Sequence, residues 1–205
     1  MSNSGVNEIG TGRPIDEIRL VGGRRALDFV NTIHDRHASD LEDYLSDGDR
    51  YLAWSRRAGL LTQSEARQIG RRDLPASLLG EMRGLREHLY RLFTARIDGR
   101  RPDRASLAAL DAWLQRAWSG QTLAPDRDDW LRWRSEAVDA TLPLRVVALS
   151  ALDILQHCSS ERLKRCSAEN ECGWLFVDDS KNNARRWCSM DTCGARAKMR
   201  RYRST

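Results

Sequence analysis

Apolar residues along this chain of 205 residues recur mainly with the period of an α-helix. The longest helix is predicted from about Ser77 to Ile97, and Asp98-Gly99 supplies its end. Its apolar residues are spaced by four and three positions, and they are Leu78, Met82, Leu85, Leu89 and Leu92. Because this spacing forms one continuous face, the helix is expected to bury that face in a core.

Shorter segments ahead of this helix have a similar spacing. A Gly-Gly turn leads into a short helix with Leu27 and Val30 on its buried side. Further helices are predicted from Asp49 and over 64–71. Residues 1–16 are polar and rich in Gly, Ser and Asn, which predicts a flexible tail.

The segments behind it add helices and one small sheet element. A helix is predicted from Pro102-Asp103 to Gly120, with the apolar residues Leu107, Leu110, Leu114, Ala117 and Trp118. Alternation of apolar and charged residues over 121–134 predicts a β-hairpin. Thr141 offers an N-cap for a helix that runs to about His157 and is apolar on nearly all sides.

The composition is that of a globular protein. Apolar residues make up 40% and charged residues 31% of the chain, too apolar for a disordered protein and too charged for a membrane protein. The longest apolar run, 142–155, is interrupted by Arg145 and Asp153, and no secretory signal is visible at the start. These features exclude a membrane protein and a secreted disulfide scaffold, and they predict a cytoplasmic protein.

The net charge of +5 is confined to the C-terminal part of the chain. Residues 161–205 hold eleven Lys or Arg and six Asp or Glu, whereas the two signs balance over the preceding residues. The last 25 residues contain eight basic side chains against the single acid Asp191. Such asymmetry is typical of a tail that faces nucleic acid or a membrane surface.

All five cysteines lie after residue 157, which predicts a metal site. Two short pairs separated by fifteen residues are the spacing of a structural zinc site, in which two knuckles and the hairpin between them complete a tetrahedron. The predicted ligands are Cys166, Cys172, Cys188 and Cys193. The alternatives are an iron–sulfur cluster, free thiols, or a ligand set that includes His157 or Cys158, although Cys158 is expected to be a packing residue.

The residues after the last of these cysteines predict a basic helix. If this segment is helical from Gly194, three of its arginines share one face and two further cations lie beside it. A solvated basic terminus is the plain alternative, but attachment to a metal-fixed knuckle favours contact with DNA phosphates. The predicted contacts are Arg196, Lys198, Arg200, Arg201 and Arg203, with Arg185 and Arg186 as secondary candidates.

The sequence from 162 to 203 resembles the CGNR zinc-finger family of bacteria through the motifs CGWLF, RRWCSM and C-G-x-R-A-K-x-R-R. The segment GGRRALDFVNT resembles the start of the ABATE domain, which commonly precedes that finger. The family is regarded as one of stress-induced transcription regulators. The resemblance implies a helical ABATE-like domain over 17–158, a finger over 159–205 in the order knuckle, hairpin, knuckle and helix, one structural Zn²⁺ on the four cysteines named above, and DNA binding by the finger.

Two positions depart from the family pattern. Ala195 stands where the family has Asn, so any contact made by that Asn is missing here. Five residues, 167–171, separate the first two cysteines, where the family usually has four. We expect the additional residue to form a bulge.

Asp28, Asn31 and Thr32 are the candidate ligand-binding residues of the N-terminal part. Helical spacing places them on one polar face, as expected for the pocket of a small-molecule sensor. The alternative is that Asp28 or Asn31 braces the Gly-Gly turn. His34 and His37 have a spacing that suggests a metal pair, but solvent-exposed loop residues are expected. The chain contains no nucleophile elbow or phosphate-binding glycine loop, so we do not expect an enzyme.

The sequence therefore predicts a cytoplasmic transcription regulator of the bacterial type. Its zinc module is expected to bind double-stranded DNA, and its helical domain to sense a small-molecule effector or to form a homodimer. Trp174 and Trp187 are expected to pack the zinc core rather than to stack on bases. The alternatives are binding of RNA by the same helix and docking of the zinc module on an acidic protein surface.

Overall fold

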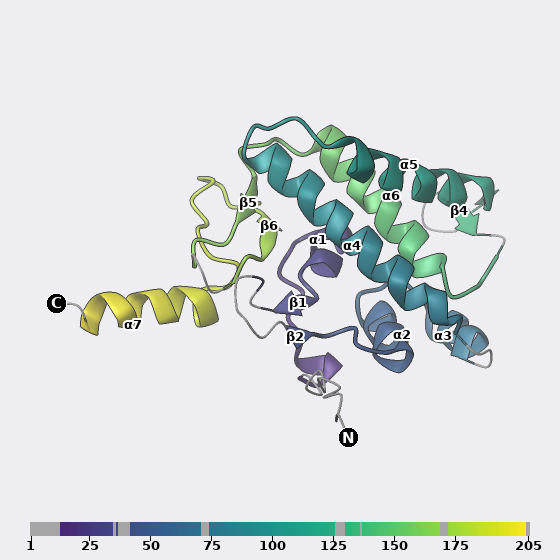
Figure 1. Cartoon of the computed structure of the whole chain (residues 1–205), viewed down its shortest axis with the longest axis horizontal. Helices are drawn as coiled ribbons and strands as arrows, with labels where there is room; N and C mark the ends of the chain where they lie inside the picture. Colours follow the sequence, from purple (N-terminus) through teal and green to yellow (C-terminus); the bar gives the residue numbers. More distant parts are fainter. Residues whose placement is uncertain are drawn as a thin grey trace, which may run out of the picture.

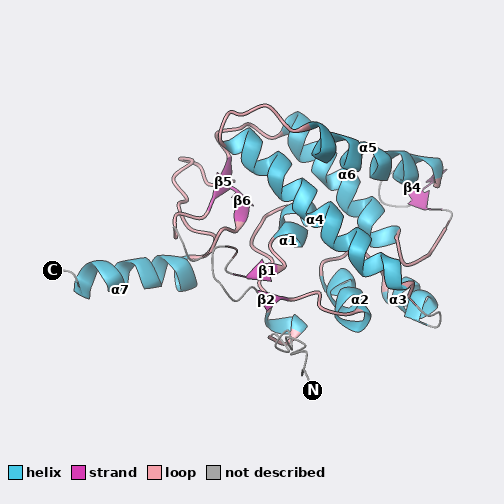
Figure 2. Cartoon of the chain, in the orientation of Figure 1, coloured by secondary structure: helices cyan, strands magenta, loops and turns pink. Residues whose placement is uncertain are grey.

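The computed structural model is built around long helices that pack against one another. These helices are α4 (Ala76–Ile97), α5 (Arg104–Ser119) and α6 (Leu142–His157), and the short helix α1 (Arg25–Val30) packs against α4 and α6 (Figures 1 and 2). The structure describes residues 13–34, 36, 42–70, 74–125, 130–135, 137–168 and 172–203.

Short helices and small hairpins complete the N-terminal part. The helical elements are a 3-10 turn, η1 (Ile15–Glu17), and the helices α2 (Gly48–Arg57) and α3 (Gln63–Gly70). The antiparallel hairpins pair β1 (Ile33–His34) with β2 (Glu42–Asp43), and β3 (Gln121–Pro125) with β4 (Leu131–Ser135).

The main sequence predictions for this part are confirmed. The predicted stripe of α4 is buried, with exposed fractions of no more than 2% for Leu78, Met82, Leu85, Leu89 and Leu92. The hairpin predicted over 121–134 is present as β3 and β4, with Thr122 opposite Arg134. The mainly helical fold class therefore follows from the spacing of apolar residues.

The apolar stripe of α5 differs from the predicted one. Leu110 and Leu114 are buried as expected, but Leu107 and Trp118 are 46% and 50% exposed, and Trp113 is buried. At 100° per residue, Leu107 and Trp118 lie at the edge of the face that carries the buried residues. This helix packs against α4 and α6, and these two residues at the edge of the face stay partly exposed.

Helix α6 begins where it was predicted to begin, but Thr141 does not cap it with its side chain. The Thr141 hydroxyl instead donates to the Asp139 carboxylate at 2.6 Å. Pro143 occupies the first turn, where a missing N–H costs nothing. The same helix buries Arg145, whose guanidinium donates to the Ala137 carbonyl at 2.6 Å.

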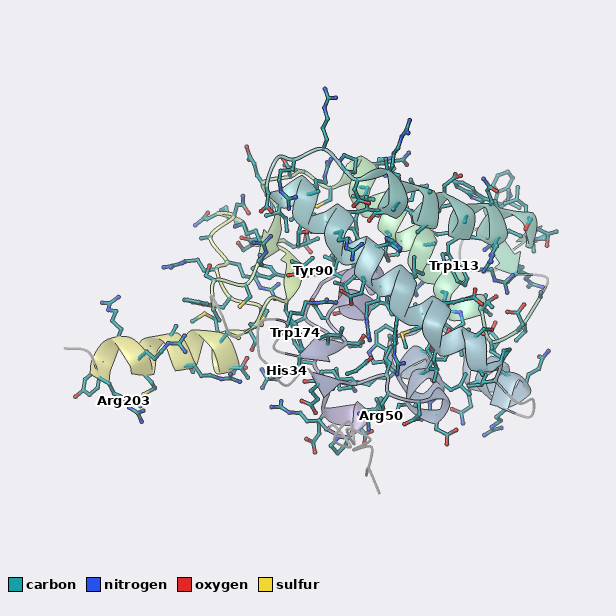
Figure 3. All side chains as sticks on the ribbon, in the orientation of Figure 1. His34, Arg50, Tyr90, Trp113, Trp174 and Arg203 are labelled. Carbon is teal, nitrogen blue, oxygen red and sulfur yellow. The ribbon has the colours of Figure 1, made fainter. Side chains whose placement is uncertain are left out.

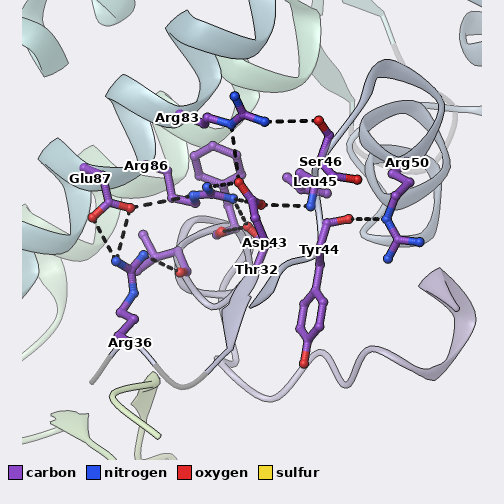
Figure 4. A network of polar contacts seen from close by, with 12 residues as sticks. Thr32, Arg36, Asp43, Tyr44, Leu45, Ser46, Arg50, Arg83, Arg86 and Glu87 are labelled. Carbon is purple, nitrogen blue, oxygen red and sulfur yellow. Dashed lines mark hydrogen bonds and ion pairs between the residues drawn. The ribbon is translucent and has the colours of Figure 1, made fainter. Parts of the chain in front are cut away.

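A buried ion pair fastens the β2 strand to α4. Arg86 is 1% exposed and donates to both carboxylate oxygens of Asp43, at 2.8 and 2.7 Å, and to the Thr32 hydroxyl at 2.9 Å (Figure 4). Burial acts to raise the pKa of Asp43, but the hydrogen bonds and charge of Arg86 outweigh it and lower that pKa.

Some predictions fall outside the described residues. They concern most of the tail predicted over 1–16, His37, and residues 169–171 of the lengthened first cysteine connection. Ile15, at the end of the predicted tail, is buried in the core. In the part of the chain that the structure describes, no helix is long and apolar enough to cross a membrane.

Candidate metal centre and the basic helix beside it

The first cysteine pair lies in a hairpin that packs against the helical core. Strand β5 (Leu163–Arg165) pairs antiparallel with β6 (Leu175–Val177), and the pair occupies their connection. The Cys166 N–H donates to the Trp174 carbonyl at 2.8 Å. The sequence predicts a hairpin between the two cysteine pairs. In the structure the hairpin strands lie on either side of the first pair, and the segment that leads from β6 to the second pair forms no strand.

Asp178 organises that returning segment. Its buried carboxylate accepts hydrogen bonds from Lys164 Nζ at 2.6 Å, the Arg185 N–H at 2.8 Å and the Ser180 N–H at 3.0 Å. Burial alone would raise the pKa of Asp178, but these hydrogen bonds hold it below its ordinary value. The returning backbone therefore bonds to a side chain instead of a neighbouring strand.

The second cysteine pair is held by a short π-helical turn, η2 (Met190–Gly194). The Cys188 N–H donates to Cys166 Sγ at 3.4 Å, which joins the two pairs directly. A Cβ on Gly194 would lie 2.9 Å from Met190 Sδ and 3.1 Å from Trp187 Cδ1. Gly194 therefore lets the chain pass close to Trp187 before the last helix begins.

The four predicted cysteines converge on one point. All are buried, and all four Sγ atoms lie within 4.8 Å of one another. Cys172 and Cys193 lie 3.6 and 3.5 Å from Cys188, measured between Sγ atoms. Zn–S bonds of about 2.3 Å give a tetrahedron with edges of about 3.8 Å, so these sulfurs fit a zinc ion.

The thiols also need a cation for electrostatic reasons. Hydrogen bonds from the neighbouring thiols lower the pKa of Cys166, whereas its proximity raises the pKa of Cys172 and of Cys188. Four thiolates at these distances repel one another, and a divalent cation removes that repulsion. The site would thus hold one structural metal ion whose four coordination positions are all taken by cysteines, with no position left for water or substrate.

The alternative ligands from the preceding helix are not part of this cluster. Cys158 is half-buried and packs against the core, with its thiol near the Ser159 carbonyl at 3.5 Å. His157 is exposed and lies 3.1 Å from the Asp153 carboxylate. The expectation that Cys158 is a packing residue agrees with this position.

Arg185 and Arg186 have different surroundings. The Arg185 guanidinium stacks on Phe176 at 4.2 Å and donates to the Trp187 and Val21 carbonyls, at 3.0 and 2.9 Å, and to the carbonyl of Cys188. It braces the second cysteine pair, so a DNA contact would break these bonds. Arg186 is exposed and lies over the Trp187 ring.

The zinc part and the helical part share one core. The contact between them, which we call the seam, was not predicted from the sequence. Asn31 is 2% exposed, and its amide accepts from the Leu175 N–H and donates to the Leu175 carbonyl, each at 2.8 Å. The buried Trp174 donates its indole N–H to the Ile33 carbonyl at 2.8 Å and lies edge-on to His34 (Figure 3). Helical spacing placed Asn31 on a polar face, but nothing in the sequence indicates that it bonds to the backbone of Leu175.

The residues predicted to share a ligand pocket have separate roles. Asn31 bonds to β6, and Thr32 is buried, donates to the Phe29 carbonyl and accepts from Arg86. Only Asp28 reaches a surface pocket. It also accepts from the Gly22 N–H at 2.8 Å, which confirms the alternative that it braces the Gly-Gly turn.

The chain ends in a helix that stands away from the rest of the molecule. Helix α7 (Ala195–Arg203) contains no buried residue and projects beyond the finger, with Arg203 in its last turn (Figures 1 and 3). Arg196, Arg200 and Arg203 line the same depression, of about 560 Å³, as helical spacing predicts. The exposed cations of α7 are Arg196, Lys198, Arg200, Arg201 and Arg203.

Comparison with known families agrees with both halves of this description. Residues 162–205 match the CGNR zinc finger, so the cluster of four buried cysteines is its zinc site. Residues 23–157 match the ABATE family, which is described as "Putative stress-induced transcription regulator" and not as an enzyme. No curated protein matches the chain. The chain therefore belongs to the ABATE family of transcription regulators and carries a CGNR zinc finger at its C-terminal end.

Proposed function

We propose that the protein binds double-stranded DNA through α7, which the zinc site holds at the surface. The observation that carries this proposal is a helix with five cations and no buried residue, joined directly to the zinc ligand Cys193 by Gly194. A zinc site fixes the start of the helix, so the cations are presented as a rigid array.

The dimensions of α7 suit the major groove. An α-helix with its side chains is about 10 to 12 Å across, so it fits a groove about 12 Å wide. The nine residues of α7 extend about 13.5 Å along the helix axis, at 1.5 Å per residue. In this proposal the face of Arg196, Arg200 and Arg203 points into the groove, where one or two arginines read guanine edges. Lys198, Arg201 and Arg186 contact phosphates. We leave Arg185 out because its hydrogen bonds brace the zinc site.

The helical domain is proposed to regulate this contact. Its seam with the finger, through Asn31 and Trp174, offers a physical route from one half to the other. Sensing of a small-molecule effector is developed below. Formation of a homodimer by the helical domain is the alternative role predicted from the sequence.

The test compares affinities for a random-sequence DNA duplex and for a single-stranded RNA of equal length, by fluorescence anisotropy of the zinc-loaded protein. The proposal predicts tighter binding of the duplex and a loss of affinity in Arg203→Gln. Arg67→Gln is the matched control, because Arg67 is an exposed arginine of α3 at the other end of the molecule (Figure 1). Equal or tighter binding of the RNA would contradict the proposal, and no binding of either would favour a protein partner.

A further inference from the structure

A surface pocket of about 490 Å³ lies where α1 meets α6, away from the basic face of α7. Its wall includes Arg25 and Asp28 from α1, and Val146, Leu149 and Ser150 from α6. We call it the Asp28 pocket. It combines an apolar wall with a charge of each sign, which is the composition of a small-molecule site.

The acidic group of the pocket is the carboxylate of Asp28, and one of its two oxygens has a hydrogen-bond partner. Asp28 Oδ1 accepts from the Gly22 N–H, while its Oδ2 has no hydrogen-bond partner among the described residues. Burial raises the pKa of Asp28 to about 6, and the charge of Arg185 and the Gly22 hydrogen bond oppose that rise. At neutral pH the group is therefore an ionised carboxylate in a partly desolvated position, and such groups are found preferentially at functional sites.

The basic side of the pocket is an arginine without a partner. The Arg25 guanidinium forms no hydrogen bond or ion pair within the described ranges. Arg24, which also lines the pocket, is already paired with Asp179 at 3.3 Å. Val146 and Leu149 line the same pocket and give it an apolar wall.

We propose that the Asp28 pocket binds a small zwitterion, an α-amino acid with an apolar side chain. The ammonium group pairs with Asp28, the carboxylate pairs with Arg25, and the side chain packs on Val146 and Leu149. A ligand of one charge would satisfy one of these groups and be repelled by the other. A zwitterion satisfies both with charge-assisted hydrogen bonds.

The pocket is connected to the finger by hydrogen bonds, so a bound ligand can affect the finger. Gly22, which Asp28 holds, accepts from the Val177 N–H of β6 at 2.9 Å. A Cβ at Gly22 would lie 2.7 Å from Leu27 Cβ, so the turn rests directly on α1. A ligand on Asp28 therefore acts on the turn that seats the finger. Regulation of the finger by this ligand rests on the proposed function, whereas binding of the ligand to the pocket does not.

The test is calorimetric titration of the zinc-loaded full chain, without DNA, with L-leucine, L-valine and L-phenylalanine. The two matched probes are 3-methylbutylamine and 4-methylpentanoate, which are leucine without its carboxylate and without its amine. We expect at least one amino acid to bind. For leucine, removal of either charge is expected to weaken binding by about tenfold, the equivalent of one charge-assisted hydrogen bond.

Substitutions of the pocket residues test whether the amino acid binds in this pocket. Asp28→Asn keeps the size of the side chain and the acceptor for Gly22, and it is expected to weaken binding of the amino acid by about tenfold, as is Arg25→Gln. Arg67→Gln should change nothing. The proposal is overturned if none of the three amino acids binds at millimolar concentration, if 4-methylpentanoate binds as well as leucine, or if Asp28→Asn binds as tightly as the parent protein. Because no DNA is present, none of these outcomes depends on the DNA proposal.

Discussion

Asp28 is a residue whose ionisation opposes folding. Its pKa is about 6 in the folded protein and 3.8 in an unperturbed chain, mainly because burial disfavours the charged form. Between these two pH values the folded state binds a proton that the unfolded chain has released, so the contribution of Asp28 to stability falls as the pH rises. At neutral pH the charge costs about 3 kcal/mol relative to the neutral form.

Asp28→Asn should therefore stabilise the protein at pH 7.5, by up to about 3 kcal/mol. The difference from the parent protein should shrink by about 1 kcal/mol at pH 5.5, where part of the parent population is protonated. Urea unfolding of both proteins at the two pH values measures this difference. A difference that does not change with pH would contradict the assignment.

Asp43 illustrates the opposite case, a largely buried carboxylate whose pKa is lowered because it is paired with a buried arginine, Arg86. Asp43→Asn removes the carboxylate that is hydrogen-bonded to the buried Arg86 and leaves the charge to the more exposed Glu87, 3.8 Å from Arg86 Nε, so we expect a loss of about 3 kcal/mol in the free energy of unfolding. The control is Asp111→Asn on the exposed side of α5, which should cost less than about 0.5 kcal/mol. Equal effects of the two substitutions in urea unfolding would show that the buried pair is not formed.

At the scale of elements, periodicity predicts which faces are buried but not what covers them. The stripe of α4 was predictable because five apolar residues repeat without interruption. The burial of Trp113 in place of Leu107 and Trp118 depended on how much of α5 its neighbours cover. The four cysteines were predictable from their spacing, and the basic helix from its charges. The contact of Asn31 with β6 was not, because it joins residues 144 positions apart.

Asn31→Ala tests that contact. The substitution leaves the buried N–H and carbonyl of Leu175 without partners, which should cost about 2 to 4 kcal/mol in the free energy of unfolding. It should also speed the release of zinc to a colorimetric chelator, because β6 flanks the first cysteine pair. Asn182→Ala, in an exposed turn, is the matched control. An unchanged release rate in Asn31→Ala would contradict the role of the seam.

At the scale of the whole molecule, the finger and the helical bundle are parts of one structure. Buried residues of both halves, including the zinc-binding cysteines, belong to one apolar cluster. Binding of a structural metal contributes its free energy to folding. The stability of the helical part should therefore depend on the metal in the finger.

Removal of zinc with a chelator is expected to lower the thermal midpoint of the helices as well as that of the finger. Circular dichroism at 222 nm follows the helices, and tryptophan fluorescence reports on the seven tryptophans of both halves, among them Trp174 at the seam. Both signals should shift together in one transition. Helices that melt at the same temperature with and without zinc would contradict a shared core.

The central claim is that α7 contacts the DNA backbone, and the salt dependence of duplex affinity tests it most directly. Each phosphate contact contributes about −0.9 to the slope of log K against log salt. The triple variant Arg186→Gln, Lys198→Gln, Arg201→Gln removes the three side chains proposed to contact phosphates, so it should reduce the steepness by about 2.7. The charge-matched control Arg67→Gln, Arg101→Gln, Arg104→Gln should leave it unchanged. Equal slopes for the two triple variants would contradict the account.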